Sequence, residues 1–190
     1  KPIWLIADKA DRADDNGEAF FKYCTQHGNK KIKYKFLIGK NSGDYARLKK
    51  IGTVIPYMSL RHKLNFLLAD CIISAYSHPE LNNPFYEYNA PYRDIMQNGV
   101  IHNDASIPLN RFIKNISGFV TTAKREYECI ESSYGYQKEA IWLTGLPRYD
   151  LLSHEEEKAL VIMPTWRRNL FGAYHAEDSR YDLLPGFEQS

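Results

Sequence analysis

Ile141-Trp142-Leu143-Thr144-Gly145-Leu146-Pro147-Arg148 decides the fold, because an apolar run stops there on Gly and Pro beside polar groups. Two other stretches repeat the pattern: Ile95-Met96-Gln97-Asn98-Gly99-Val100 and Leu160-Val161-Ile162-Met163-Pro164-Thr165-Trp166-Arg167. Apolar runs this short, separated by helical segments, predict buried parallel strands. Ligands of open α/β sheets bind at the carboxyl ends of the strands, so we expect the polar residues after these runs to face one cleft.

Outward from these runs, short apolar segments alternate with amphipathic ones. Strands are predicted at residues 3–7, 32–38, 53–57, 71–75, 93–96, 119–122, 140–144 and 159–163. Helices are predicted from Asp15 or Asn16 to Gly28 and at 44–50, 60–68, 107–113 and 124–134, with a helix or linker at 149–157. Lysines alternate with apolar residues in 32–38, which suggests an edge strand. The order predicts an α/β fold with a doubly wound, Rossmann-like parallel sheet.

The bulk composition is that of an ordinary soluble protein, with 190 residues, 44% hydrophobic, and a net charge of +2. This charge gives no general signal for nucleic acid. Ten basic residues and one acid, Asp44, nevertheless lie between Lys30 and Lys63. Such a run predicts contact with phosphates or an anionic membrane surface, or it is a set of solvated faces.

Several classes of protein are disfavoured by what the sequence lacks. The three Cys share no CxxC spacing, and no His, Cys or carboxylate cluster has the spacing of metal ligands, so we expect no metal and a reducing cytoplasm. A P-loop and a GxGxxG motif are absent, which disfavours nucleotide switches and NAD enzymes. No run approaches the roughly 18 apolar residues of a membrane span. Both ends look cut, so a fragment of a longer protein is expected.

Four stretches, in order, resemble motifs of the CDP-glycerol glycerophosphotransferase family, which includes teichoic acid primases, polymerases and related capsule enzymes. The opening Ile3-Trp4-Leu5-Ile6, with Asp14 to Tyr23, is similar to the family's "IWLI…DNG…FFKY". Residues 97–104 resemble "QHGV…D", residues 143–150 resemble "TGLPRYD", and residues 163–167 resemble "PTWR". The four matches span nearly the whole chain.

The resemblance implies the N-terminal half of a GT-B fold with the start of a second domain. Residues 1–150 would form the acceptor-side Rossmann-like domain, and 151–190 the linker and the truncated start of the donor domain. The implied reaction is attack by an acceptor hydroxyl on the β-phosphorus of CDP-glycerol, with CMP leaving. No cofactor is expected beyond this donor substrate. The implied bacterial enzyme uses a lipid-linked teichoic acid or polyol-phosphate acceptor and is peripheral on the inner face of the cell membrane. The piece alone is expected to be inactive.

Asn98 departs from the family pattern, because it stands where "QHG" has a His. A His suits a general base, whereas Asn cannot take the proton. Three explanations remain: an engineered inactivating change, natural divergence to a weakened or binding-only protein, or replacement by His102. Asn98 is also an ordinary residue for a turn before Gly99.

The other candidate site residues follow from the motifs, each with a plainer alternative. Asp15, Asn16 and Gly17 would recognise acceptor at a helix N-terminus, or simply cap the helix. Arg148 would hold a phosphate, or pair with a nearby acid. The remaining candidates are Gln97, Gly99 and Asp104 in the cleft, with Asp104 alternatively a helix cap, and Thr165 and Arg167 on the donor side.

Two other functions remain open at this point. The first is a non-catalytic Rossmann-like module that binds a polyanionic glycerol-phosphate polymer, which Asn98 favours. The second is a sugar-transferring GT-B enzyme, against which the "QNG" and "PTWR" stretches argue, although fold analogy alone does not exclude it.

Overall fold

The structure is a computed structural model, and it describes residues 1–74, 84–85, 94–96, 105–112, 116–153, 160, 171–175 and 180–183. The chain divides into two compact units, Lys1–Ser153 and His154–Ser190. The division lies close to the boundary predicted at residue 150. The assignment of the units to acceptor and donor domains stays a prediction.

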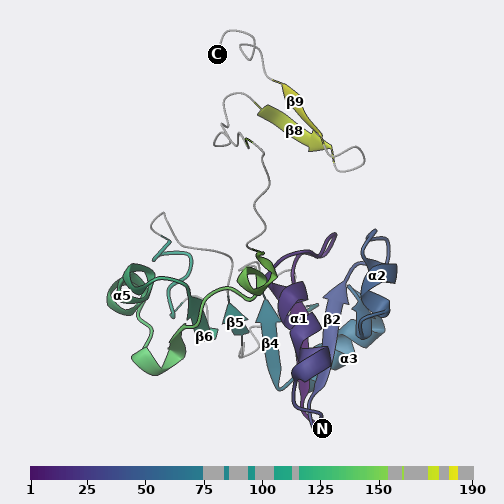
Figure 1. Ribbon diagram of the computed structural model, residues 1–190, viewed down its shortest axis with the longest axis horizontal. Coiled ribbons are helices and arrows are strands. Elements are labelled where there is room, and N and C mark those ends of the chain that lie inside the picture. Colours follow the sequence, from purple (N-terminus) through teal and green to yellow (C-terminus); the bar gives the residue numbers. More distant parts are fainter. Residues whose placement is uncertain are drawn as a thin grey trace. The chain divides into compact units, whose positions relative to one another are not determined.

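The first unit is built on a seven-stranded parallel sheet in the order β3-β2-β1-β4-β5-β6-β7 (Figure 1). The strands are β1 Ile3–Ala7, β2 Lys33–Ile38, β3 Thr53–Pro56, β4 Cys71–Ser74, β5 Asp94–Met96, β6 Ile116–Thr121 and β7 Ile141–Leu143. Every neighbouring pair in this sheet is parallel. The expected α/β fold with a Rossmann-like sheet is therefore confirmed.

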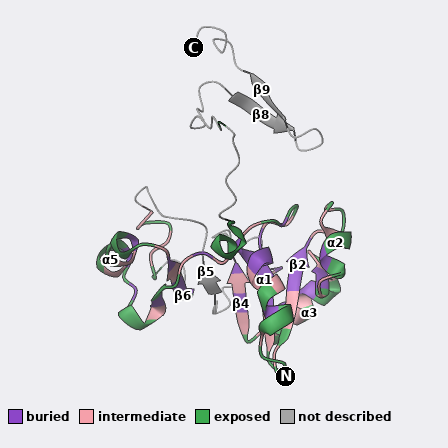
Figure 2. Cartoon of the chain, viewed as in Figure 1, coloured by how far each residue is buried: buried purple, intermediate pink, exposed green. Residues whose placement is uncertain are grey.

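Helices flank both faces of this sheet. The helices of the unit are α1 Asn16–His27, α2 Tyr45–Lys49, α3 Leu60–Leu68 and α5 Lys124–Ser133, with 3-10 turns η1 Lys138–Ala140 and η2 Pro147–Leu151. Alternate residues of a strand face opposite sides. Ile6 accordingly packs in the cluster that contains Phe21 of α1, whereas Leu5 packs with Phe66 of α3. Figure 2 shows buried, purple stretches on α1 and on the central strands.

Two predictions about single elements were wrong. β2 is not an edge strand, because it pairs with β1 and β3, and β3 is the edge. The lysines of β2 do not mark an edge strand. Lys33 is exposed because it begins the strand, and the Lys35 side chain donates to Asn65 of α3. The described part of the predicted helix at 107–113 forms turns instead. Leu109 N–H donates to the Ala105 carbonyl in a single turn, but Arg111 N–H donates to the distant Tyr134 carbonyl at 3.0 Å, so no helix continues.

The second unit contains an element that the sequence pattern did not predict. β8 Phe171–His175 pairs antiparallel with β9 Arg180–Leu183. The expectation of strictly alternating strands and helices missed this hairpin. The strand predicted at 159–163 lies outside the described residues, apart from Leu160.

Candidate functional site

The N-terminus of α1 and the turn η2 meet, although more than 130 residues separate them in the sequence. The Arg148 guanidinium forms an ion pair with Asp15 Oδ1 at 2.9 Å. The Arg148 backbone N–H donates to Asn16 Oδ1 at 3.3 Å. The structure thus brings together Asp15, Asn16 and Arg148, three of the residues that the motifs singled out. The nearby acid that pairs with Arg148 is itself a predicted site residue.

Asp8 fixes the start of α1, and sequence reasoning did not single it out. Its carboxylate is buried and accepts from Gly17 N–H at 2.7 Å, Glu18 N–H at 3.0 Å and Asp15 N–H at 3.3 Å. Burial raises the pKa of Asp8 to about 6, although these N–H groups favour the ionised form. An acid directly after a buried strand and before a helix is the signal that would have found it.

These bonds change how the N-terminus of α1 can be used. Asn16 N–H donates to Asp15 Oδ1, Gly17 and Glu18 N–H donate to Asp8, and Ala19 N–H donates to the Asp15 carbonyl. Each of the first four backbone donors of the helix is therefore occupied within the chain. A phosphate at this site would bind through side chains, Arg148 above all, rather than through helix amides.

Gly17 is required by the close approach of α1 to β1. A Cβ added there would lie 2.5 Å from Asp8 Oδ1 and 2.7 Å from the Ala7 carbonyl oxygen. Real Cβ atoms essentially never come this close, so any side chain would push the helix start away from the strand. The Asn16-Gly17 step therefore has a structural role independent of any ligand.

Replacing Gly17 by Ala should lower the free energy of unfolding by about 2–3 kcal/mol, because the added methyl overpacks against backbone atoms that cannot rotate away. Urea denaturation monitored by circular dichroism measures the change. Gly43→Ala is the matched control, since nothing lies within 4 Å of a Cβ at Gly43. Equal stability of the two variants would contradict this role for Gly17.

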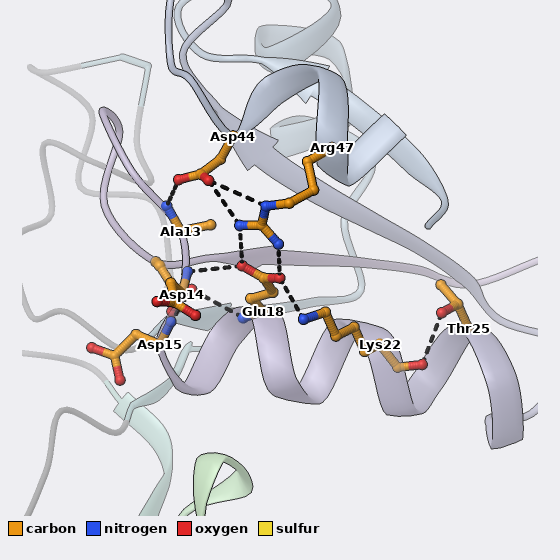
Figure 3. A network of polar contacts seen from close by, with 9 residues as sticks. Ala13, Asp14, Asp15, Glu18, Lys22, Thr25, Asp44 and Arg47 are labelled. Atoms are coloured by element: carbon orange, nitrogen blue, oxygen red, sulfur yellow. Dashed lines mark hydrogen bonds and ion pairs between the residues drawn. The ribbon is translucent and has the colours of Figure 1, made fainter. Parts of the chain in front are cut away.

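Glu18 anchors the loop before α1 to α2 (Figure 3). Its carboxylate is buried, accepts from Asp14 N–H at 2.8 Å, and pairs with Lys22 at 2.7 Å and with Arg47 Nη2 at 2.8 Å. Burial alone would raise the pKa of Glu18, but the hydrogen bonds from Arg47 and Lys22 outweigh it and lower the pKa to about 2. The pattern Asp15-x-x-Glu18, an acid three residues after a cap, was the available signal.

Just after β7, two successive backbone N–H groups share one acceptor. The N–H groups of Thr144 and Gly145 both donate to the Thr121 carbonyl, at 3.2 and 3.1 Å. Gly145 has a φ of +82°, in the region that favours glycine. This reversal turns the chain into η2 and so delivers Arg148 to α1.

A cavity of about 390 Å³ lies beside this meeting point. Apolar side chains make most of its wall, and a few polar groups come from the ends of α1, β4 and β7. Among the residues that the structure describes, those lining it are Trp4, Asn16, Gly17, Phe20, Ile73, Ser74, Val120, Trp142, Thr144, Gly145 and Pro147. Within the described part of the chain, Asn16 Nδ2 is a buried side-chain donor with no hydrogen-bond partner.

Six predicted site residues lie outside the described residues: Gln97, Asn98, Gly99, Asp104, Thr165 and Arg167. Their convergence with Arg148 stays a prediction. In the ranges that the structure describes, no group of three His, Cys, Asp or Glu residues could hold a metal ion. None of the helices in those ranges has the length and apolar character needed to cross a membrane.

Comparison with known proteins places the chain in a family. The model of the family described as CDP-Glycerol:Poly(glycerophosphate) glycerophosphotransferase matches residues 1–185. The minor teichoic acid biosynthesis protein GgaB of Bacillus subtilis (strain 168) is 45% identical over 179 residues. That match covers 90% of this chain and 20% of GgaB, so the chain spans about a fifth of this relative.

Two solved structures of His-to-Asn variants of the wall teichoic acid polymerase TagF share the fold. The first, from a 15-minute soak with CDPG, has a TM-score of 0.62 and 15% identity, and covers 91% of this chain and 49% of TagF. The second has a TM-score of 0.56 and 13% identity, and covers 80% of this chain and 39% of TagF. Because the family model matches residues 1–185, the chain belongs to the CDP-glycerol:poly(glycerophosphate) glycerophosphotransferase family.

Proposed function

We propose that the protein to which this chain belongs transfers glycerol phosphate from CDP-glycerol to a lipid-linked teichoic acid or capsule acceptor and releases CMP. The observation that carries the proposal is the family match over residues 1–185. The contacts of Asp15 and Asn16 with Arg148 support it, because they join two of the family-like stretches at the carboxyl ends of the strands.

The described residues suit the positioning part of a phosphoryl transfer. Such reactions depend mainly on orientation and on stabilisation of charge on the phosphoryl oxygens. The Arg148 side chain is 44% exposed although it pairs with Asp15. Its guanidinium has five donors, so it can keep Asp15 and also bind a phosphate oxygen. We assign Arg148 to the acceptor side of the cleft on this basis.

Release of CMP tests the proposal. The full-length protein is incubated with CDP-glycerol and a lipid-linked glycerol-phosphate acceptor, and CMP is measured by chromatography. We expect CMP only when both substrates are present, at a low rate because Asn98 cannot act as a base. Absence of CMP from both the native protein and the Asn98→His variant would overturn the proposal.

Asn98 also favours a second candidate, a module that binds polyanionic glycerol-phosphate polymer without turnover. This reading predicts binding of glycerol-phosphate oligomers that weakens steeply as salt is raised. It also predicts no CMP from the Asn98→His variant. Release of CMP by the Asn98→His variant therefore distinguishes the two candidates: the transferase releases it and the binding module does not.

We further propose that α3 contacts the anionic inner face of the cell membrane. His62 and Phe66 of this helix are buried, whereas Leu60, Leu64, Leu67 and Leu68 are exposed. Exposed leucines at helical spacing beside the basic residues Arg61 and Lys63 form the kind of surface that lies in a membrane interface. Arg47 does not contribute to this charge, because Glu18 and Asp44 hold it.

Replacing Leu64 and Leu67 together by Asp should weaken binding to vesicles of phosphatidylglycerol and phosphatidylcholine by roughly tenfold or more, because two apolar anchors are lost and negative charge is added. Vesicle sedimentation measures the partition. Leu152→Asp, at another exposed leucine, is the control. A double variant that partitions like the native protein would rule out α3 as the contact.

A further inference from the structure

Lysines gather at the amino ends of β2 and β3, at the opposite end of the sheet from the candidate site. In a parallel sheet, the segments that enter the strands lie at this end, which the N label marks in Figure 1. The first turn (residues 28–32) enters β2, and the second turn (residues 49–52) enters β3. Five exposed residues in and beside these turns form what we call the lysine array: Lys30, Lys31, Lys33, Lys49 and Lys50.

The two turns of the array are neighbours in space. Lys35 of β2 lies opposite Thr53 of β3 in the register of the sheet, so Lys33 is level with the second turn. A Cβ added at Gly52 would lie 2.8 Å from Phe21 Cζ. The second turn therefore packs against α1, the helix that leads into the first turn. The array is one surface rather than a set of scattered lysines.

No acid neutralises the array among the residues that the structure describes. None of its five side chains forms an ion pair there. Asp70 lies at the same end of the sheet, before β4, and its Oδ2 accepts from the Ile3 N–H at 2.8 Å. Burial lowers the pKa of Lys35, and so does the charge of Lys33. The second cause shows that positive charges at this end of the sheet are close enough to repel one another.

Helix stability accounts for only part of this charge. Lysines in the last turn of a helix interact favourably with its dipole, which suits Lys49 and Lys50 at the end of α2. Lys30 and Lys31 lie beyond the end of α1, and Lys33 begins a strand, so this gain is small or absent for them. Like charges placed together at a cost in repulsion form a surface that a bound anion would stabilise.

The chemistry and the spread of the array define the ligand. An exposed Lys holds a single phosphate only weakly, so useful binding needs several phosphates on one ligand. The exposed neighbours of the lysines include Gln26, Asn29 and Thr53. These polar residues offer none of the apolar anchors that hold a protein in a bilayer interface. A flexible chain with a phosphate on every unit, such as poly(glycerol phosphate), meets both requirements.

We propose that the lysine array binds the phosphate groups of a glycerol-phosphate polymer, at the end of the sheet opposite the candidate site. That this polymer is the acceptor or the product of the protein rests on the proposed transferase function. A polymer held at the array stays tethered, which raises the effective concentration of its free end at the candidate site. The binding itself rests only on the charge and the arrangement of the array.

Fluorescence anisotropy of a labelled glycerol-phosphate oligomer with the full-length protein, without CDP-glycerol, tests the binding. The affinity is measured from about 50 to 200 mM salt. The array variant carries three exposed changes together: Lys31→Gln, Lys33→Gln and Lys50→Gln. We expect it to bind the oligomer at least about tenfold more weakly at low salt. The slope of log affinity against log salt should fall by about 2, since each neutralised phosphate of a single-stranded polyanion contributes about 0.7.

The matched control variant removes the same charge elsewhere, through Lys124→Gln, Arg125→Gln and Lys138→Gln. These residues are exposed on α5 and η1, and Lys124 and Lys138 already pair with Glu128 and Glu131. Distant exposed charges are screened, so the control variant should bind the oligomer within about twofold of the native protein. Equal losses in the two variants would reduce the effect to net charge and overturn the proposal. Unchanged binding by the array variant would overturn it as well.

Vesicles of phosphatidylglycerol and phosphatidylcholine distinguish a polymer from a lipid surface. Sedimentation with these vesicles should give the same partition for the array variant as for the native protein. An array variant that loses vesicle binding but keeps oligomer binding would make the array a membrane contact and overturn the proposal.

Failure of this proposal and failure of the transferase proposal are distinguishable. Oligomer binding with the expected variant pattern, but no CMP release from the native protein or from Asn98→His, would retain the lysine array and remove the transferase function. CMP release, with oligomer binding and acceptor KM both unchanged in the array variant, would do the reverse.

Discussion

Replacing Asn98 by His in the full-length protein should raise the rate of glycerol phosphate transfer by about 10²–10⁴-fold, the usual contribution of a positioned general base. The physical reason is that the Asn amide can orient the attacking hydroxyl but cannot accept its proton. Imidazole can, because its pKa lies near neutrality. Release of CMP from CDP-glycerol, measured as kcat at saturating acceptor, is the readout. The gain should appear in kcat more than in KM, since Asn and His are of similar size.

His102→Gln is the partner experiment for this prediction. If His102 serves as the base in the native protein, His102→Gln abolishes transfer and Asn98→His adds little. If residue 98 is the base position, His102→Gln leaves the gain from Asn98→His intact. An Asn98→His variant that neither releases CMP nor changes polymer binding would contradict the base assignment.

Replacing Glu18 by Ala should cost about 3–4 kcal/mol of unfolding free energy, the range typical of removing one member of a buried, hydrogen-bonded ion pair. Arg47 and Lys22 would lose a shared anion, and the Asp14 N–H would lose its acceptor. The Arg47 side chain is 43% exposed, so water relieves part of the penalty, and we expect the lower end of this range. Urea denaturation near neutral pH measures the loss.

The matched control is Glu128→Ala, which removes an exposed helical pair with Lys124 at 3.8 Å. That pair should be worth only about 0.3–0.5 kcal/mol. Similar losses for the two variants would show that burial of Glu18 contributes nothing.

The effect of Glu18→Ala should depend on pH in a defined direction. The pKa of Glu18 falls from 4.5 to about 2 on folding, so its stabilisation is complete above 4.5 and is lost as the pH falls toward 2. The difference between native and variant protein should therefore be largest near neutral pH and clearly smaller at about pH 3. Asp8, whose raised pKa acts in the opposite direction between about 4 and 6, is present in both proteins and cancels. A difference that grows on acidification would contradict the ion-pair account.

Local signals in the sequence determined the class of fold and most of its elements. The strand Ile3–Ala7, a helix from Asp15 or Asn16 to Gly28, and a helix at 60–68 were each predicted from neighbouring residues. The structure has these elements, with Asp15 as the cap of the first helix. The spacing of apolar residues and the chemistry of helix caps depend on residues close together in the sequence. Strands and helices can therefore be predicted from the sequence alone. The α/β class follows, because alternation of such segments leaves few ways to bury them.

Elements that depend on distant partners could not be predicted in this way. The edge assignment of β2 was wrong because strand order is set by packing across the whole sheet, not by the lysines of one strand. Burial on α3 does not follow hydrophobicity either, because Leu60, Leu64, Leu67 and Leu68 are exposed while His62 of the same helix is buried. Arg111 bonds to the Tyr134 carbonyl instead of continuing a helix, and no local pattern announces that bond.

Some features of the candidate site were predicted from the sequence, and others required the tertiary structure. From the motifs alone came Asp15, Asn16, Gly17 and Arg148 as residues of interest, together with the family and its chemistry. Only the tertiary structure decided that Arg148 pairs with Asp15, that Asp8 accepts from the first backbone N–H groups of α1, and that Asn16 Nδ2 is buried without a hydrogen-bond partner. The reason is that residue type sets which bonds a side chain can make. Which of those bonds form is set by how closely the fold brings together residues far apart in the chain.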